Sequence, residues 1–182
     1  IQFSTFNSVY QFYHDKVTGR MDNAKAMLML PDYFHFRLTG VKKQEYTNAT
    51  TTGMVNSITH QWDEEILEKL GYPKALFETP LPPATVAGEF TQEIQKRVGY
   101  NAKVVLCPSH DTASAVAAAP LEEGDAYISS GTWSLMGVEL TDPITNDKAF
   151  DANVTNEGGI EYRFRFLKNI MGLWMIQSIR RE

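Results

Sequence analysis

The sequence predicts a mixed α/β fold, which two segments and one spacing pattern indicate. Residues 103–116 pass from an apolar stretch through a tight polar turn into an Ala-rich stretch, which predicts a strand, a turn and a helix. Residues 126–138 hold two β-rich runs around a Ser-Ser-Gly-Thr turn, which predicts a hairpin. Residues 1–71 carry apolar side chains mainly at helix spacing. Strands and helices combined in this way are typical of an α/β protein.

Five helices are expected before residue 100. Apolar spacing, a proline in a first turn, polar caps and closing glycines indicate them. In chain order they are a helix with Phe6, Val9, Tyr10 and Tyr13, a helix with Ala24, Met27 and Leu28, a helix from Pro31 to a stop at Gly40, a helix that follows the cap Asp63 and ends at Gly71, and a helix from Thr91 to Val98 that ends at Gly99.

Between these helices, the Thr- and Asn-rich tract over residues 47–52 suits a loop or a short strand. Its hydroxyl groups are candidates for contacts with a sugar. A plain surface turn is the alternative, because Thr and Asn are common turn residues.

The end of the chain is expected to form a turn at Gly158-Gly159, a strand over residues 162–166 and a helix over residues 167–181. This helix is apolar on nearly all sides, which predicts that it is buried. Asn169 and Gln177 interrupt it eight residues apart, within about 90° on the helix surface and about 12 Å along the axis. Buried amides need hydrogen-bond partners, which neighbouring backbone groups or ligands can supply.

Composition argues against several classes of function. An apolar content of 43% in 182 residues suffices for one sizeable core or parts of two. The net charge of −5 and the scattered basic residues argue against a nucleic-acid partner. No apolar run is long enough for a bilayer, and no signal peptide is recognisable. Cys107 is the only cysteine, which fits a reducing cytoplasm, and its place in the strand before the turn predicts burial.

Two turns are candidates for chemistry. Asp111 lies where a strand gives way to a helix, at the edge where open α/β sheets bind ligands, and it suits either a general base or a helix cap. Gly131 permits a close backbone approach in the hairpin turn, where N–H groups and the Thr132 hydroxyl suit phosphate oxygens. An ordinary polar turn is the alternative for the second site.

Six runs of the chain carry a recognisable pattern, over residues 31–40, 45–52, 108–116, 129–137, 153–159 and 167–174. In this order they resemble the FGGY carbohydrate kinase family. The resemblance implies part of an actin-like, ribonuclease-H-like ATPase fold with two lobes and a ligand cleft between them. Residues 1–120 would be the C-terminal part of the first lobe, and residues 121–182 the N-terminal part of the second, with a boundary at Pro120 and an acidic turn.

The same resemblance implies roles for individual residues. Asp111 would be the catalytic base, and Mg²⁺ would accompany ATP, held by phosphates and by carboxylates outside this chain. His110 is expected to contact the sugar as a neutral hydrogen-bonding group or to relay a proton; the other histidines show no metal-ligand spacing around it. The remaining implied contacts are Thr112 and Asn169 with the sugar, and Gly131, Thr132 and Gln177 with ATP.

The implied activity is ATP-dependent phosphorylation of a ketose sugar in the cytoplasm. Neither the phosphate-binding hairpin that opens such kinases nor their Gly-rich adenosine site is recognisable here, and Ile1 is not an initiator Met. The chain is therefore expected to be part of a longer kinase, to have the remainder of that kinase as its partner besides sugar and ATP, and to have no turnover alone. Another sugar or polyol kinase of the family, and a non-catalytic module of the same fold, are the alternatives.

Overall fold

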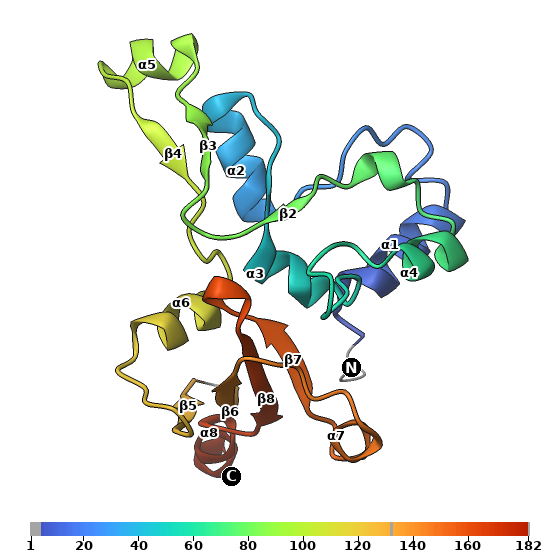
Figure 1. Cartoon of the computed structure of the whole chain (residues 1–182), viewed down its shortest axis with the longest axis vertical. Helices are drawn as coiled ribbons and strands as arrows, with labels where there is room; N and C mark the ends of the chain where they lie inside the picture. The colour runs from blue at the N-terminus through green and yellow to red at the C-terminus, as the bar shows by residue number, and fades with distance from the viewer. Residues whose placement is uncertain (1–4, 132, 182) are drawn as a thin grey trace. The chain divides into compact units, whose positions relative to one another are not determined.

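The computed structural model describes residues 5–131 and 133–181. These residues form two compact units that divide between His110 and Asp111 (Figure 1). We call residues 5–110 the first unit and residues 111–181 the second unit. Both units combine helices with strands, which confirms the predicted α/β class.

The first unit is mainly helical, with two small two-stranded sheets. β1 pairs with β2 in parallel, and β3 pairs with β4 antiparallel. The elements of the first unit are α1 Ser8–Val17, α2 Leu30–Thr39, β1 Gln44–Glu45, α3 Tyr46–Ala49, the 3-10 helix η1 Thr50–Thr52, α4 Glu64–Leu70, the 3-10 helix η2 Lys74–Leu76, β2 Pro80–Leu81, β3 Val86–Glu89, α5 Gln92–Val98 and β4 Lys103–Val105.

Four of the five expected helices are confirmed as α1, α2, α4 and α5. Asp63 caps α4 by accepting a hydrogen bond from the Ile66 N–H, and a left-handed glycine ends α2, α4 and α5. α1 and α4 pack around a core that includes Met54, Trp62 and Leu67, whereas Leu38 of α2 packs against a separate cluster of Ala87, Val104 and Leu106. The expected helix at residues 24–28 is wrong, because Met27 instead forms a bridge to Phe77.

The expected loop or short strand at residues 47–52 is also wrong, because this tract is helical. Glu45 caps α3 by accepting hydrogen bonds from the backbone N–H groups of Thr47 and Asn48. The hydroxyls of Thr50, Thr51 and Thr52 then donate to carbonyls three residues earlier. The polar side chains that suggested a turn therefore bond within the helical turns themselves.

The predicted strand, turn and helix around Asp111 are confirmed as β4, the following loop and α6. The strand is covered on one side only, since Val104 and Leu106 are buried and Val105 is exposed. The expected burial of Cys107 is wrong. Cys107 lies beyond β4 and is exposed.

A four-stranded antiparallel sheet in the order β5-β6-β8-β7 forms the body of the second unit (Figure 1). The predicted hairpin is confirmed, since β5 and β6 pair from Ala126 opposite Val138 to Ser129 opposite Leu135. The elements of the second unit are α6 Asp111–Ala118, β5 Ala126–Ser129, β6 Ser134–Leu140, α7 Asp147–Asp151, β7 Thr155–Gly158, the 3-10 helix η3 Ile160–Tyr162, β8 Phe164–Ile170 and α8 Trp174–Arg181.

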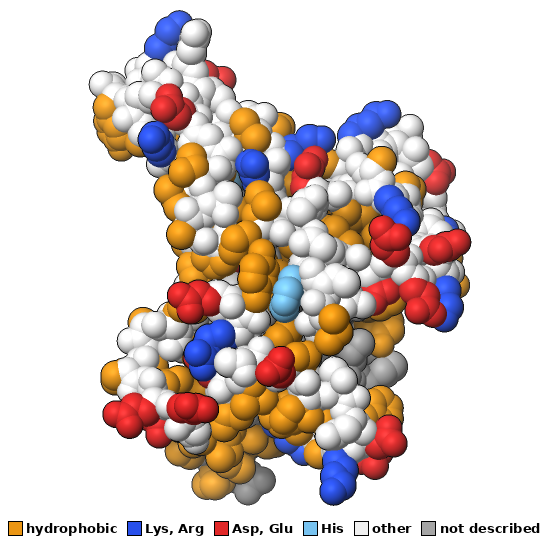
Figure 2. All heavy atoms as spheres, viewed as in Figure 1, with side chains coloured by type: hydrophobic (Ala, Val, Ile, Leu, Met, Phe, Trp, Pro, Cys, Tyr) orange, Lys and Arg blue, Asp and Glu red, His pale blue; other side chains and the backbone are white. Residues whose placement is uncertain are grey.

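The single buried helix expected over residues 167–181 is wrong. Residues 167–170 continue β8, which pairs with β6 from Phe164 to Ile170. Gly172 takes a left-handed conformation with φ of +54°, and α8 begins only at Trp174. The apolar side chains of α8 are exposed, and Figure 2 shows hydrophobic surface in the lower part of the view, where Figure 1 places α8.

The expected lobes, residues 1–120 and 121–182, remain a prediction. The two compact units divide nearer to the N-terminus, so that α6 belongs with the sheet of the second unit. Within the described residues, no helix combines the length and the apolar character that a membrane crossing needs.

Candidate active site

Asp111 is the first residue of α6, and its side chain is exposed. Its Oδ1 accepts hydrogen bonds from the Thr112 N–H at 2.6 Å and from the Thr112 hydroxyl at 3.3 Å. The carboxylate therefore contacts the first turn of its own helix. Its exposure also makes it accessible to a substrate hydroxyl, so the geometry accommodates both expected roles.

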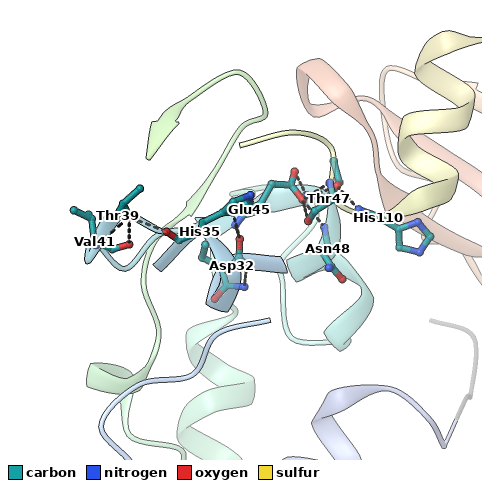
Figure 3. Close-up of polar contacts among 10 residues, drawn as sticks. Asp32, His35, Thr39, Val41, Glu45, Thr47, Asn48 and His110 are labelled. Carbon is teal, nitrogen blue, oxygen red and sulfur yellow. Dashed lines mark hydrogen bonds and ion pairs between the residues drawn. The ribbon is translucent and has the colours of Figure 1, made fainter. Parts of the chain in front are cut away.

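The loop before α6 is tied to α3. Glu45 Oε2 accepts hydrogen bonds from the Ser109 N–H at 3.2 Å and from the Ser109 hydroxyl at 2.8 Å. The His110 N–H donates to the Thr47 hydroxyl at 3.4 Å (Figure 3). The residue that precedes Asp111 is thus held by a segment far away in the sequence.

A second buried carboxyl group lies behind Glu45. Asp32 on α2 accepts hydrogen bonds from the Gln44 side-chain amide at 2.7 Å and from the Glu45 N–H at 3.1 Å, and all three side chains have no exposed surface (Figure 3). Burial raises the pKa of Asp32 to about 7, with the nearby Glu45 charge acting in the same direction. His35 Nδ1 lies 3.7 Å from Asp32 Oδ1, and burial lowers the pKa of His35.

The raised pKa of Asp32 predicts a pH dependence of stability. Unfolded Asp32 ionises near pH 3.8, whereas the folded side chain keeps its proton up to about pH 7, so the free energy of unfolding should fall as pH rises between these values. Asp32→Asn removes this titration. At pH 8 we expect the free energy of unfolding, measured with urea, to be about 2–4 kcal/mol higher for the Asn variant than for the unaltered protein. Near pH 4 this difference should vanish. An advantage of equal size at both pH values would contradict this prediction.

Gln44 explains how the Asn side chain fits. Among the described residues, the Gln44 Oε1 atom has no hydrogen-bond partner. Rotation of the Gln44 amide would present this oxygen to the new Asn amide, although it turns the Gln44 amide N–H groups away from residue 32. His35 has the opposite pH dependence, because its lowered pKa makes stability fall as the solution becomes acidic. Because both the unaltered protein and Asp32→Asn contain His35, the difference between their free energies of unfolding at each pH reports the titration of Asp32 alone.

The hairpin turn between β5 and β6 lies against the segment that leads into α8. The Leu173 N–H donates to the Gly131 carbonyl at 3.0 Å, and a side chain at Gly172 would collide with Ser134 Oγ. The Gly131 N–H, expected to face phosphate, donates to Ser134 Oγ at 3.3 Å. Thr132, the other expected phosphate contact, lies outside the described residues.

Asn169 and Gln177 do not share a helix. Asn169 lies in β8 opposite Leu135 of β6, next to the hairpin turn, and is partly buried. Gln177 lies in the first turns of α8 and is exposed. Asn169 therefore lies next to the hairpin turn on a strand, and Gln177 lies in the helix that follows the segment bonded to this turn. The single helix expected to carry both residues does not form.

The described residues of the second unit thus include five of the expected site residues, and His110 ends the first unit. The described residues contain no cluster of three His, Cys, Asp or Glu side chains able to hold a metal ion. Sequence reasoning missed the buried Asp32 and Glu45. The available signals were the place of Asp32 in the first turn of a predicted helix and the place of Glu45 just before a tract of Thr and Asn residues.

Two family models match the chain. The N-terminal domain of the FGGY family of carbohydrate kinases matches residues 2–118, and the C-terminal domain of the same family matches residues 126–182. The chain is 52% identical to the rhamnulokinase of Halalkalibacterium halodurans and 51% identical to that of Oceanobacillus iheyensis. Each alignment covers 100% of this chain but only 39% of the relative.

Solved structures show the same fold. The chain superposes on a ligand-bound xylulose kinase from Lactobacillus acidophilus with a TM-score of 0.84 and 20% identity, covering 97% of this chain and 36% of that one. A gluconate kinase from the same organism gives a TM-score of 0.87 and 20% identity, with 99% and 37% covered. The predicted actin-like ATPase fold, present in part, is therefore confirmed.

Proposed function

Because the chain belongs to the FGGY family of carbohydrate kinases, we propose that the protein phosphorylates L-rhamnulose with ATP, giving L-rhamnulose 1-phosphate in rhamnose catabolism. The observation that carries this proposal is the identity of about half of all residues to rhamnulokinases, spread over the whole chain. Since the chain spans 39% of the length of those relatives, the activity is proposed for the complete kinase that contains these residues.

In this proposal Asp111 is the general base. It takes the proton from the attacking sugar hydroxyl while the new bond to the γ-phosphorus forms and the bond to the departing ADP breaks. Its exposure and its place at the start of α6 support the assignment. The two hydrogen bonds from Thr112 hold Oδ1, which orients the carboxylate. One oriented carboxylate suffices, because phosphoryl transfer depends mainly on alignment and charge stabilisation.

His110, Thr112 and Asn169 form the proposed sugar site. Thr112 is buried, and its hydroxyl donates to Asp111, so its part is to hold the base as much as to touch the sugar. The peptide group of His110 is anchored through its N–H to Thr47. Asn169 projects from β8 beside the hairpin, where a side-chain amide can donate to and accept from sugar hydroxyls.

Gly131, Thr132 and Gln177 form the proposed ATP contacts. Gly131 lies between β5 and β6, two paired strands that restrain its backbone. Gln177 lies near the N-terminal end of α8, where the helix dipole favours negative charge. Mg²⁺ would neutralise phosphate charge, and in this chain Asp111 is the carboxylate proposed to reach it, through water.

The substrate proposal predicts a preference among sugars. We expect the complete kinase to release ADP from ATP at least about tenfold faster with L-rhamnulose than with L-fuculose, D-xylulose or glycerol, judged by kcat/KM. A coupled ADP assay at equal sugar concentrations measures this. A preference for another sugar would rule out L-rhamnulose as the substrate. It would not affect the family membership or the proposal that Asp111 is the general base.

The 182-residue chain tested alone is expected to release no ADP from ATP, because sites that align phosphate are built from both lobes in this proposal. Turnover by the complete kinase on none of the four sugars would favour a non-catalytic module of the same fold.

A further inference from the structure

Glu45 connects the start of α3 with the loop that leads into Asp111, two segments 64 residues apart. We infer that Glu45 is a positioning residue that holds this loop, and through it Asp111, in the geometry needed for proton transfer. The inference rests on the proposed function, because it assigns Glu45 a part in the same reaction. The side chain is fully buried, so it acts through its contacts with the loop.

The Glu45 carboxyl group accepts five hydrogen bonds, all from neutral donors. Three come from α3: the Thr47 N–H at 2.8 Å, the Thr47 hydroxyl at 2.7 Å and the Asn48 N–H at 3.0 Å. Two come from Ser109, through its N–H at 3.2 Å and its hydroxyl at 2.8 Å. An acceptor surrounded only by donors is the environment that suits a carboxylate, and such bonds are stronger than those between neutral groups.

Thr47 extends the contact to the residue before Asp111. Its hydroxyl donates to Glu45 and accepts a hydrogen bond from the His110 N–H at 3.4 Å (Figure 3). The N–H groups of Ser109 and His110 are therefore both fixed by this cluster. Because each peptide group is planar, fixing these two groups restricts the backbone that enters α6 at Asp111.

Glu45 is itself held from behind. Its N–H donates to Asp32 at 3.1 Å, and Asp32 also accepts from the side chain of the preceding residue, Gln44, at 2.7 Å. All three side chains have no exposed surface, which restricts their rotamers. A continuous set of hydrogen bonds thus runs from Asp32 on α2 through Glu45 to Ser109, in the loop that leads into Asp111.

Helix capping alone does not account for a glutamate at this position. Asp, Asn, Ser and Thr are the preferred N-caps, and any of them could serve the two N–H groups at the start of α3. The additional methylene of Glu45 carries the carboxylate out to Ser109. Glu45→Asp should therefore keep the cap of α3 and lose the hold on the loop, which separates the two roles.

The test uses Glu45→Asp and Ser109→Ala in the complete kinase. We expect Glu45→Asp to speed amide exchange at Ser109 and His110 by about tenfold or more, to lower kcat by about tenfold to 100-fold and to leave the ATP KM within about threefold. Ser109→Ala should have a smaller effect in the same direction. The double variant should lose little beyond Glu45→Asp, because both changes break the same contact.

Asp63→Asn is the matched control. Asp63 also caps a helix of the first unit, but its carboxylate accepts hydrogen bonds from the Ile66 N–H and the Asn56 side-chain amide, which lie outside the loop. It should leave both kcat and amide exchange at Ser109 unchanged. Unchanged exchange at Ser109 in Glu45→Asp, or a kcat that falls no more than in Asp63→Asn, would overturn the inference. Should Glu45→Asp fail to fold, an unchanged kcat and unchanged exchange in Ser109→Ala would also overturn it.

The two proposals fail separately. If the unaltered kinase phosphorylated no sugar, the proposed function would be wrong, and amide exchange at Ser109 would still decide whether Glu45 holds the loop. If the kinase were active and Glu45→Asp left both kcat and exchange unchanged, only the positioning role would be wrong.

Discussion

Asp111→Asn should lower the kcat of the complete kinase by about 10²–10⁴-fold, the range that a lost general base costs. The KM for the sugar should change by less than about threefold, because proton transfer matters mainly in the transition state. Asn caps helices as well as Asp does, so the start of α6 is preserved while the substitution removes the carboxylate charge that accepts the proton and is proposed to reach Mg²⁺ through water. A coupled assay of ADP release at saturating sugar and ATP measures the change.

Asp125→Asn provides the matched control for this prediction. Asp125 is another exposed carboxylate of the second unit, and it accepts a hydrogen bond from the Glu122 N–H in a surface turn. Its substitution should leave kcat unchanged. If Asp111→Asn retained kcat within about threefold of the unaltered kinase, Asp111 would be a helix cap and not the base.

Arg165→Met should destabilise the second unit by about 3–5 kcal/mol, because it leaves a carboxylate without its buried partner. Arg165 lies in β8 with no exposed surface, and its Nη2 contacts Glu157 Oε2 at 3.2 Å and the Gly158 carbonyl at 3.1 Å. Glu157 and Glu139 flank it on the neighbouring strands. The midpoint of urea unfolding, followed by a probe in the sheet, measures the loss.

A second substitution tests the cause of that loss. Combining Arg165→Met with Glu157→Leu should recover a large part of the lost stability, because an apolar pair can replace a buried ion pair at little cost. Lys69→Met is the control, since Lys69 pairs with Glu65 on the exposed surface of α4 and such pairs contribute little. Equal destabilisation by Arg165→Met and by the double variant would contradict the expected role of the unpaired carboxylate.

Local patterns in the sequence predicted much of this protein. The helices α1, α2, α4 and α5, the strand and helix around Asp111, and the β5–β6 hairpin follow from apolar spacing, caps and closing glycines, and the structure confirms them. These signals act within a few residues of the chain, so they can be recognised without the rest of the fold. The resemblance to carbohydrate kinases likewise rests on short runs of residues, and the family matches confirm it.

Contacts between distant segments decided the remainder. Residues 167–170 have the spacing of a helix, yet they form a strand because all four pair with β6, and Leu167 also pairs with β7. The tract at residues 47–52 has turn composition, yet it is helical because Glu45 caps it and the threonine hydroxyls bond carbonyls three residues earlier. The contact of Glu45 with Ser109 joins segments 64 residues apart. No local pattern determines such a contact, because the energy of a buried hydrogen bond depends on which partner the folded chain brings within reach.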